Sequence, residues 1–471
     1  PPSLSLSLGK RYFTWDKTYF PNPKALFDDV ASRGRKAVAI VDPHIKKDEE
    51  WPLYKGASKA GHFVKTKDGS DFEGWCWPGS SSYLDVTSSP VRDWWAGRFA
   101  LDTYAGSTPD LHIWNDMNEP SVFNGPEVTM PKDALHAGGW EHRSLHNQYG
   151  FWYHAATAQG LAARGRKAAG SDGDRPFVLS RAFFAGTQTV GPVWTGDNSA
   201  DWAHLRASVP MLLSLGLAGL PFSGADVGGF FGDPSPDLLV RWYQAAALQP
   251  FFRGHAHLDA PRREPWLGGE PGTAAIREAL RSRYRLLPYL YTLFRAANTT
   301  GAPIMRPVWW DFPADPEAPP LDDQFMVGPA ILTAPVLTPA PEAEASKPLA
   351  DRITPRRVYL PPSAAWYDAS SGGLVSMPGK GGGWADVQAR FSDTPTFLRG
   401  GFVIPVRERA RRSSAAAARD PITLVVALDP VGKACGDLYL DDGKSFAFAR
   451  GVYAARRICF DMGLDGEAGA G

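Results

Sequence analysis

The chain has 471 residues, with 50 basic and 50 acidic side chains and a formal net charge of zero. This balance gives no support for a nucleic-acid or membrane-surface partner, and no apolar run reaches the roughly 18 residues that a membrane span needs. Three cysteines form neither a disulfide framework nor a zinc-ligand pattern, and 44% hydrophobic residues indicate a globular protein of two or three domains.

Strand-like apolar runs alternate with helical stretches in the first part of the chain. Helical stretches follow Tyr149 and Trp202 and span residues 237–248. The strand-like runs occupy residues 36–41, 110–116, 175–184, 191–198, 217–226 and 249–257. This alternation favours a parallel sheet, and we expect an α/β fold with a (β/α)8-type barrel over residues 1–300.

Every one of these strand-like runs ends at a polar or charged side chain. The six ends lie at or near Asp42, Asp116, Arg181, Asp197, Asp226 and His255. Because barrel enzymes carry their active sites at the C-terminal ends of the strands, we expect these side chains to face a common mouth. The alternative for any single Asp is that it caps the following helix. For Glu119 and Asp226 we expect a structural hydrogen-bonding role.

Two carboxylates that face one cavity suit glycoside hydrolysis, in which one attacks the anomeric carbon and the other protonates the leaving oxygen. Asp116 and Asp197 end different strands and are the candidates for this pair. In a retaining enzyme their carboxyl groups should lie about 5–5.5 Å apart. Arg181 and His255 could bind a carboxylate or a sugar hydroxyl. The aromatic residues that could wall a sugar pocket beside these strand ends are Trp77, Trp114, Trp194 and Phe230.

Two apolar stretches extend this first domain. Residues 211–220 lie between prolines and are predicted to be buried core. Residues 272–298 have a helical pattern, with a kink expected at Pro288 because proline cannot donate the helical hydrogen bond.

After Gly301 short strand-like runs alternate with Gly and Pro turns, which is typical of antiparallel β structure. We expect a proximal β-sandwich domain at residues 301–406 and a distal, incomplete β domain at 407–471. The segment 407–420 is predicted to be a basic linker or loop. Asp441, Asp442 and Gly443 are predicted to form a tight hairpin turn rather than a metal site.

Several motifs at these positions resemble one family of enzymes. They are "WNDMNEP" (114–120), "RPFVLSRAFFAGTQ" (175–188), "TGDN" (195–198), "GADVGGFF" (224–231) and "FFRGHAHLD" (251–259). Together and in this order they resemble the family 31 glycoside hydrolases, the retaining α-glucosidases. The resemblance extends from about Gly9 to about Phe448 and supports the barrel followed by C-terminal antiparallel β domains.

The resemblance implies a role for each matching residue. Asp116 matches the catalytic nucleophile and Asp197 matches the general acid/base. The residues implied to line the glucose subsite are Arg181, His255, Trp77, Trp114, Trp194, Phe230, Ile40 and Met117. The family reaction is a double displacement through a covalent glucosyl-aspartate, with retention of the α anomer and with no metal or organic cofactor.

Longer runs such as "VTMPKDALHAGGWEHR" (128–143) are similar to the glucosidase II group within this family. That likeness implies α-1,3-linked glucose on N-glycans as the substrate, the endoplasmic reticulum lumen as the location, and a non-catalytic β subunit as the partner. Two alternatives stay open. One is another family 31 enzyme that acts on maltose, starch or α-xylosides, and the other is a non-catalytic carbohydrate-binding remnant.

The N-terminal segment "PPSLSLSL" (1–8) departs from the family pattern. In the family, a β-sandwich domain and two barrel strands precede the segment that resembles "GKRYFTWD" (9–16). The resemblance therefore predicts a barrel that lacks its first two strands and one glucose-binding carboxylate, with open edges at the strands near Ile40 and Phe252. We expect the chain by itself to be poorly soluble and inactive on α-glucosides, with the Ser-Leu segment along one edge.

Overall fold

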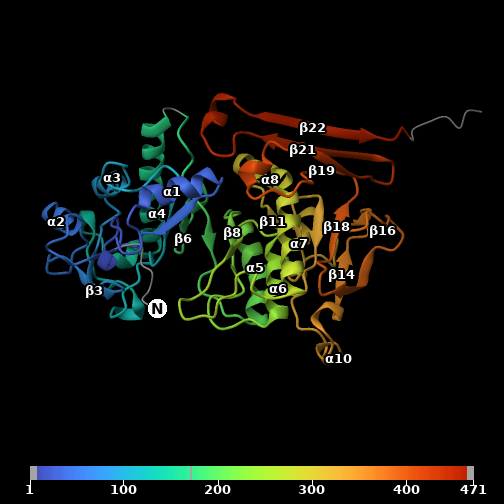
Figure 1. The fold of residues 1–471 in the computed structure, drawn as a ribbon, viewed down its shortest axis with the longest axis horizontal. Coiled ribbons are helices and arrows are strands. Elements are labelled where there is room, and N and C mark those ends of the chain that lie inside the picture. Colours follow the sequence, from blue (N-terminus) through green and yellow to red (C-terminus); the bar gives the residue numbers. More distant parts are fainter. Residues whose placement is uncertain (1–7, 170–171, 464–471) are drawn as a thin grey trace, which may run out of the picture. The chain divides into compact units, whose positions relative to one another are not determined.

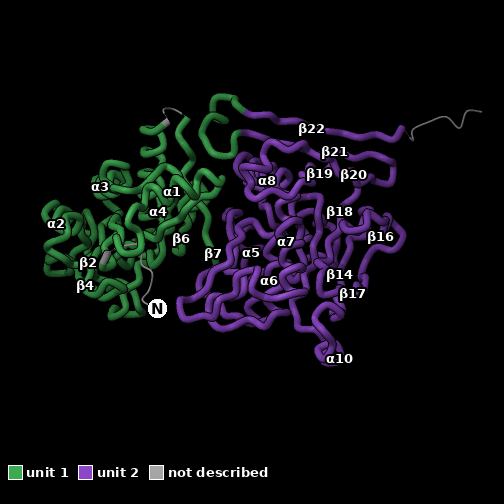
Figure 2. Tube along the Cα trace, in the orientation of Figure 1, with its two compact units in different colours: residues 1–194, 442–452 green, residues 195–441, 453–471 purple. Residues whose placement is uncertain are grey.

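The chain divides into two compact units in the computed structural model, which describes residues 8–169 and 172–463. Unit 1 comprises Pro1–Trp194 and Asp442–Val452, and unit 2 comprises Thr195–Asp441 and Tyr453–Gly471 (Figure 2). Residues 1–7 of the Ser-Leu segment, predicted to lie along a sheet edge, are outside the described residues.

The core of unit 1 contains a parallel sheet with the strand order β1-β5-β6-β7. Its strands are β1 (Ala37–Ile40), β5 (Leu111–Asn115), β6 (Val178–Ser180) and β7 (Val193–Trp194). In register, Ala39 lies opposite Ile113, which lies opposite Val178. Each strand falls within a predicted apolar run, so the predicted parallel sheet is confirmed.

Strand β5 shows how the two faces of this sheet differ. Leu111, Ile113 and Asn115 are buried, whereas His112 and Trp114 keep partial exposure. Because successive side chains in a strand point to opposite faces, Trp114 faces away from the buried Ile113 side.

Strand β1 forms an edge of the sheet, as predicted. Within the described residues it pairs with β5 alone. Its Val38 and Ile40 side chains, which share one face, are 46% and 43% exposed. Two adjacent apolar side chains are therefore presented to solvent on an edge strand.

The described part of unit 1 contains four α-helices, which precede or lie between the strands of this sheet in sequence order. They are α1 (Pro23–Ser32), α2 (Pro52–Lys59), α3 (Ser89–Gly97) and α4 (His142–Ala169). The prediction of a helix that follows Tyr149 was wrong about its start, because α4 begins at His142. Gly138 and Gly139, both with φ of 77°, form the turn before it. Gly150 stays inside α4 where a Cβ would lie only 2.5 Å from that of Ala182.

A small antiparallel sheet with the order β2-β4-β3 precedes β5 in the chain. Its strands are β2 (His44–Lys46), β3 (Glu73–Cys76) and β4 (Gly79–Tyr83). Cys76 and Gly79 are paired, so β3 and β4 form a hairpin with Trp77 and Pro78 at its tip. This hairpin was not predicted, and it determines where Trp77 lies.

Unit 2 continues the alternation of strands and helices. Its short strands are β8 (Ser223–Gly224), β9 (Asp226–Val227) and β10 (Arg253–Gly254), and its first helices are α5 (Trp202–Leu217) and α6 (Pro236–Ala246). Strands β9 and β10 are parallel, with Asp226 opposite Arg253. The predicted strands near Asp226 and His255 and the helix over 237–248 are therefore confirmed.

The predicted kinked helix over 272–298 is a pair of helices, α7 (Gly272–Arg285) and α8 (Leu287–Thr300). Pro288 occupies the first turn of α8, where its missing N–H costs no helical hydrogen bond. Within the described residues no helix combines the length and apolar character that crossing a bilayer requires.

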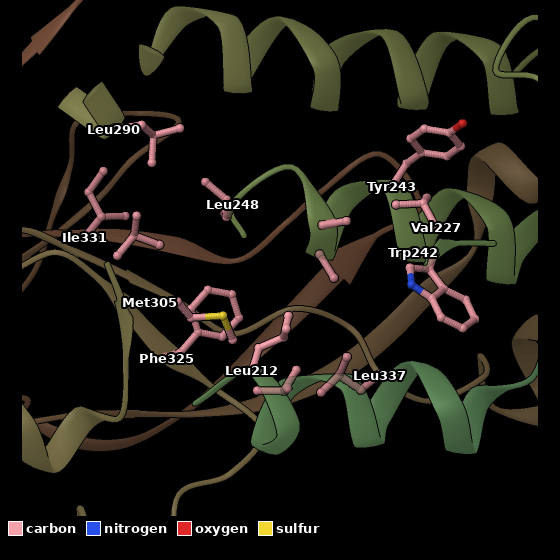
Figure 3. Packing of buried hydrophobic residues seen from close by; sticks show 14 of the residues in the cluster. Leu212, Val227, Trp242, Tyr243, Leu248, Leu290, Met305, Phe325, Ile331 and Leu337 are labelled. Atoms are coloured by element: carbon pink, nitrogen blue, oxygen red, sulfur yellow. The ribbon is translucent and has the colours of Figure 1, made fainter. Parts of the chain in front are cut away.

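The main hydrophobic core of unit 2 joins α5, α6 and α8 to the strands that follow them. Leu212, Trp242, Leu290 and Phe325 are among its buried members (Figure 3). The run 211–220 was predicted to be buried throughout, and this was only partly right. Leu212 and Leu213 are buried, but Met211 and Leu217 are 45% and 42% exposed, because they lie on a face of α5 that is turned away from the core.

After Gly301, the strands between Met305 and Arg399 pair antiparallel, as predicted. One sheet has the order β11-β12-β13-β18-β15-β16, and β14 pairs with β17 as a separate ribbon (Figure 1). The strands are β11 (Met305–Arg306), β12 (Phe325–Val327), β13 (Ile331–Thr333), β14 (Ile353–Leu360), β15 (Trp366–Asp368), β16 (Leu374–Ser376), β17 (Gly383–Arg390) and β18 (Thr396–Arg399).

The last sheet has the order β20-β19-β21-β22. Its strands are β19 (Phe402–Val406), β20 (Thr423–Ala427), β21 (Lys433–Leu440) and β22 (Ala454–Asp461). Cys435 and Cys459 lie opposite each other and form a disulfide. The predicted tight turn at Asp441-Asp442-Gly443 was wrong. Residues 441–453 form a long connection between β21 and β22, in which Asp442 accepts the Ser445 N–H at 2.9 Å.

Candidate active site

Asp116 directly follows β5, at the C-terminal end of the unit 1 sheet. Its carboxyl group accepts the Met117 N–H at 2.9 Å, and its own N–H donates to Oδ1 of Asp42 at 3.2 Å. Nη1 of Arg181, from the end of β6, lies 3.1 Å from Asp116 Oδ1. The predicted pairing of Arg181 with a carboxylate is therefore confirmed.

Met117 gives the chain a sharp bend just after Asp116. Its φ of 57° lies in the left-handed region, which costs a non-glycine residue about 1 kcal/mol or more. Neighbouring groups hold this conformation, because the Met117 carbonyl accepts the Ser121 N–H at 2.9 Å and Arg181 Nη2 lies 2.9 Å from its sulfur. The bend keeps the Asp116 side chain at the strand end.

Glu119 forms the other half of the Arg181 contact. Arg181 donates from Nε and Nη2 to the two carboxylate oxygens of Glu119, at 2.8 and 3.0 Å. Two parallel bonds fix the plane of the guanidinium group and leave Nη1 for Asp116. The predicted structural hydrogen-bonding role of Glu119 is thereby confirmed.

Asn118 is a buried residue of this site that the sequence reasoning missed. Its Nδ2 donates to Ser180 Oγ at 2.8 Å, and its Oδ1 accepts the Ala182 N–H at 3.0 Å. It thus ties the loop after β5 to the loop after β6, which carries Arg181. A buried amide inside an acidic cluster at a strand end is the signal that could have identified it.

Asp42 was noted in the sequence as a strand end but received no role. In the structure it is only 5% exposed and touches the backbone of Asp116. Burial, and then the nearby Asp116 charge, raises the pKa of the Asp42 carboxyl well above its usual range. The signal available in the sequence was its position at the end of the strand beside β5.

Two of the predicted aromatic residues meet in unit 1. The rings of Trp114 and Trp194 pack edge to face, with centroids 5.4 Å apart. Trp77, at the tip of the β3–β4 hairpin, is 54% exposed and packs edge to face on Phe123 at 4.8 Å. Ile40 ends the edge strand β1 and remains partly exposed.

Unit 2 holds the remaining predicted residues. Asp197 is exposed, three residues into the segment that follows β7. The next residue, Asn198, is buried, and its Oδ1 accepts the Phe230 N–H at 2.9 Å while its Nδ2 donates to the Asp226 carbonyl at 3.1 Å. Asn198 therefore joins the Asp197 segment to the loop that carries Phe230, a role that the sequence reasoning missed.

Phe230 and His255, both expected to line the sugar pocket, lie against each other. Their rings stack with centroids 5.3 Å apart and an interplanar angle of 29°. Burial, with a smaller contribution from Arg253, lowers the pKa of His255 to about 4, so the ring is neutral near pH 7. Asp226 accepts from Nε and Nη2 of Arg253, which confirms the hydrogen-bonding role predicted for Asp226.

The chain matches two family descriptions in sequence. Residues 4–293 match the "Glycosyl hydrolases family 31 TIM-barrel domain", and residues 301–404 match the "Glycosyl hydrolase family 31 C-terminal domain". The (β/α)-barrel followed by C-terminal β structure, as predicted, is the arrangement that these two matches describe.

Curated relatives agree with this match. The chain is 54% identical over 457 residues to "Probable glucan 1,3-alpha-glucosidase" of Arabidopsis thaliana, covering 97% of this chain and 47% of that protein. It is 52% identical over 455 residues to "Neutral alpha-glucosidase AB" of Mus musculus, covering 96% of this chain and 46% of that protein. The chain thus spans about half the length of the curated relatives that it matches.

Solved structures show the same likeness. The fold superimposes on a glucosidase II alpha subunit bound to alpha3-Glc2 with a TM-score of 0.92 and 47% identity, covering 98% of this chain and 48% of that one. A Flavobacterium johnsoniae family 31 dextranase complexed with glucose matches with a TM-score of 0.81 and 27% identity, over 95% of this chain and 53% of that one. The chain belongs to glycoside hydrolase family 31.

Proposed function

We propose that this chain carries the catalytic residues of a retaining α-glucosidase that removes α-1,3-linked glucose from N-glycans. The observation that carries the proposal is the arrangement of Asp116, which ends a barrel strand, lies mostly buried and is held by Arg181. Family membership and the 54% identity to a probable glucan 1,3-alpha-glucosidase support the same reaction.

In the proposed mechanism Asp116 is the nucleophile. A carboxylate paired with a guanidinium stays ionised and is fixed in direction, so it can attack the anomeric carbon. Attack breaks the glycosidic bond and forms a covalent glucosyl-aspartate, and water then hydrolyses this ester. Because both steps invert the anomeric carbon, the released glucose keeps the α configuration.

Asp197 is the proposed general acid in the first step and general base in the second. Its proton goes to the leaving oxygen, and it then takes a proton from the attacking water. A retaining mechanism requires about 5–5.5 Å between the carboxyl groups of the nucleophile and the acid. Asn198 positions it indirectly, because it anchors the same segment to Phe230.

The residues proposed to enclose the glucose include both polar and aromatic side chains. Arg181 supplies hydrogen-bond donors, and the neutral His255 can donate and accept. Aromatic faces pack on the CH groups of a pyranose ring, which suits the Trp114–Trp194 and Phe230–His255 pairs. The remaining proposed wall residues are Trp77, Met117 and Ile40.

The substrate, partner and location follow from the relatives that carry the likeness. Solved structures of the glucosidase II alpha subunit include one bound to Glc1Man2 and one of the ER heterodimer of the catalytic subunit with the binding domain of its regulatory subunit. We therefore propose a glucosylated N-glycan as substrate, a non-catalytic β subunit as partner, and the endoplasmic reticulum lumen as the place of action.

A chimera tests the catalytic assignment. In it, this chain replaces the 47% of the Arabidopsis thaliana relative to which it aligns. An activated fluoroglucoside should label the peptide that contains Asp116, and Asp116→Ala should abolish both labelling and turnover. Asp110→Asn is the matched control, because Asp110 precedes the same strand but pairs with Lys36 on the surface. Label on any other peptide would show that the nucleophile is misassigned.

A substrate panel separates the proposed activity from its alternatives. The chimera should release α-glucose, seen by proton NMR before mutarotation, from a glucosylated N-glycan in preference to maltose, starch fragments or α-xylosides. A preference for maltose or a xyloside would place the chain in another specificity group of the family. Glycan binding without turnover would instead favour a non-catalytic carbohydrate-binding protein.

A further inference from the structure

Asp42 contacts the main chain of Asp116. Oδ1 of Asp42 accepts the Asp116 N–H at 3.2 Å, and the Asn115 side chain donates to the carbonyl of the neighbouring Val41 at 2.8 Å. Asp42 thus connects the end of β1 to the end of β5. A substitution of the Asp42 side chain should therefore alter the position of the Asp116 backbone.

The other oxygen of Asp42 begins a buried string of hydrogen bonds. The Tyr12 hydroxyl lies 2.9 Å from Asp42 Oδ2 and 2.6 Å from Nε2 of His44. All three side chains are almost fully buried. The hydroxyl has one proton, so it donates either to an ionised Asp42 or to a neutral His44, and in the second case Asp42 is the donor to Tyr12.

The charges around Asp42 decide between these two arrangements. Besides Tyr12 and His44, the titratable groups that act on Asp42 are Cys76, Tyr83, Asp116, Tyr153 and Arg181. Burial raises the pKa of Tyr83 well above its usual range, so its hydroxyl is neutral near pH 7. Burial raises the pKa of Cys76 to about 12, raises that of Tyr153 well above its usual range, and lowers that of His44 to about 3. These three groups are therefore neutral near pH 7.

The Arg181 cation acts on Asp42, but it lowers the pKa of the Asp42 carboxyl by less than burial raises it. The nitrogens of Arg181 already serve two other carboxylates: Nε and Nη2 donate to Glu119, and Nη1 lies 3.1 Å from Asp116. If Asp42 were also ionised, one guanidinium group would have to balance three carboxylates. The Asp42 carboxylate among them would be removed from water. A buried charge without a partner costs several kcal/mol.

We propose that Asp42 is a positioning residue that keeps its proton, so that as a neutral acid it fixes the Asp116 backbone while the negative charge resides on Asp116. The proposal rests on the proposed function, because it takes Asp116 as the nucleophile. In this state Oδ2 of the Asp42 carboxyl donates to Tyr12, and Tyr12 donates to His44. Oδ1 of the same carboxyl still accepts the Asp116 N–H. An asparagine side chain reproduces each of these contacts without a charge.

The first test needs no catalysis and uses the whole chain. A carboxyl group that stays protonated only in the folded protein favours folding at low pH, and this advantage is lost as the pH rises above about 4. The Tm of Asp42→Asn minus the Tm of the unaltered chain should therefore increase as the pH rises from 4 to 7. Tyr149→Phe is the matched control, because it removes a buried hydroxyl whose bond goes to the Leu84 carbonyl.

Each outcome of the Tm series decides the proposal. A constant Tm difference across this pH range would show that Asp42 is ionised in the folded protein and would overturn it. A chain with Asp42→Asn that does not fold would also overturn it, because the amide matches the neutral acid in shape and hydrogen bonding. The Tm difference between Tyr149→Phe and the unaltered chain should stay constant with pH.

The second test measures turnover in the chimera. Asp42→Asn should retain most of the kcat and the pH profile, whereas Asp42→Ala should lower kcat by about 10²-fold, as expected when a reacting group is misplaced. A loss for Asp42→Asn as large as that for Asp116→Asn would contradict the proposal. If the unaltered chimera has no turnover, the proposed function fails, while the Tm series still decides whether Asp42 holds the proton.

Discussion

Arg181 donates two hydrogen bonds to Glu119, of 2.8 and 3.0 Å, and its Nη1 lies 3.1 Å from the carboxylate of Asp116. Glu119 thus fixes the orientation of the cation, and the cation fixes the orientation of the proposed nucleophile. The arrangement depends on the planar fork of a guanidinium group, which an ammonium group cannot reproduce.

Arg181→Lys should therefore damage the site although it keeps the charge. A lysine can serve one carboxylate well but not both, so we expect kcat/KM of the chimera to fall by about 10²-fold. The matched control is Arg143→Lys, because Arg143 pairs with Glu141 on the surface at 2.6 Å. Equal and small effects of the two substitutions on kcat/KM would show that the fork is not needed.

The strand ends could be predicted from sequence because they follow from local pattern. Apolar runs that stop at Asp116, Arg181 and Asp226 identify parallel strands and the edge at which their side chains meet. The contacts of Arg181 with Asp116, and the stacking of Phe230 on His255, follow from this placement. These residues lie at strand ends or within three residues of them, so the strand pattern is enough to bring them close.

Relations that depend on loops could not be predicted in the same way. Tyr12 reaches Asp42 from an irregular segment that has no periodic pattern, and nothing local indicates that its hydroxyl turns inward. Trp77 lies where the β3–β4 hairpin puts it, and the serine-rich β4 lacks the alternation that identifies a strand. The start of α4 was missed because its first turn is rich in histidine and charged residues.

Asp197→Ala should have an effect that depends on the leaving group. A substrate with an activated leaving group needs little protonation, whereas a sugar alcohol leaves only when an acid protonates it. We therefore expect the chimera to lose far more turnover on a glucosylated glycan than on an aryl glucoside with an acidic phenol. Equal losses in kcat on both substrates would contradict the assignment of Asp197 as the acid.

Acid should destabilise the chain through its buried histidines. Burial lowers the pKa of His142 to about 3 and that of His154 to about 4, so the unfolded chain binds more protons than the folded one below pH 6.5. Their stabilising contribution is complete above pH 6.5 and is lost as the pH falls towards 4, at up to about 1.4 kcal/mol per pH unit for each group.

His154→Gln tests this dependence, because Gln can still donate to the Val178 carbonyl that His154 Nε2 contacts at 2.8 Å. In urea unfolding between pH 7 and pH 5, this variant should lose less stability than the unaltered chain. Exposed His204→Gln is the control. An unchanged slope of unfolding free energy against pH in His154→Gln would show that His154 is already charged in the folded protein.

The edge strand β1 should make the chain self-associate. Within the described residues it pairs with β5 alone, and its Val38 and Ile40 side chains are 46% and 43% exposed. An apolar edge strand offers both backbone hydrogen-bonding groups and apolar contacts to a second copy. A lysine on such an edge disfavours pairing because it would be desolvated between two strands. Val38→Lys should therefore lower the association of the chain, measured by light scattering as a function of concentration.

Leu26→Lys is the matched control, because Leu26 is 43% exposed but lies on helix α1. If Leu26→Lys lowers the association as much as Val38→Lys does, added charge rather than the strand edge is responsible, and a chain that is monomeric without either substitution would show that β1 is not a site of association at all.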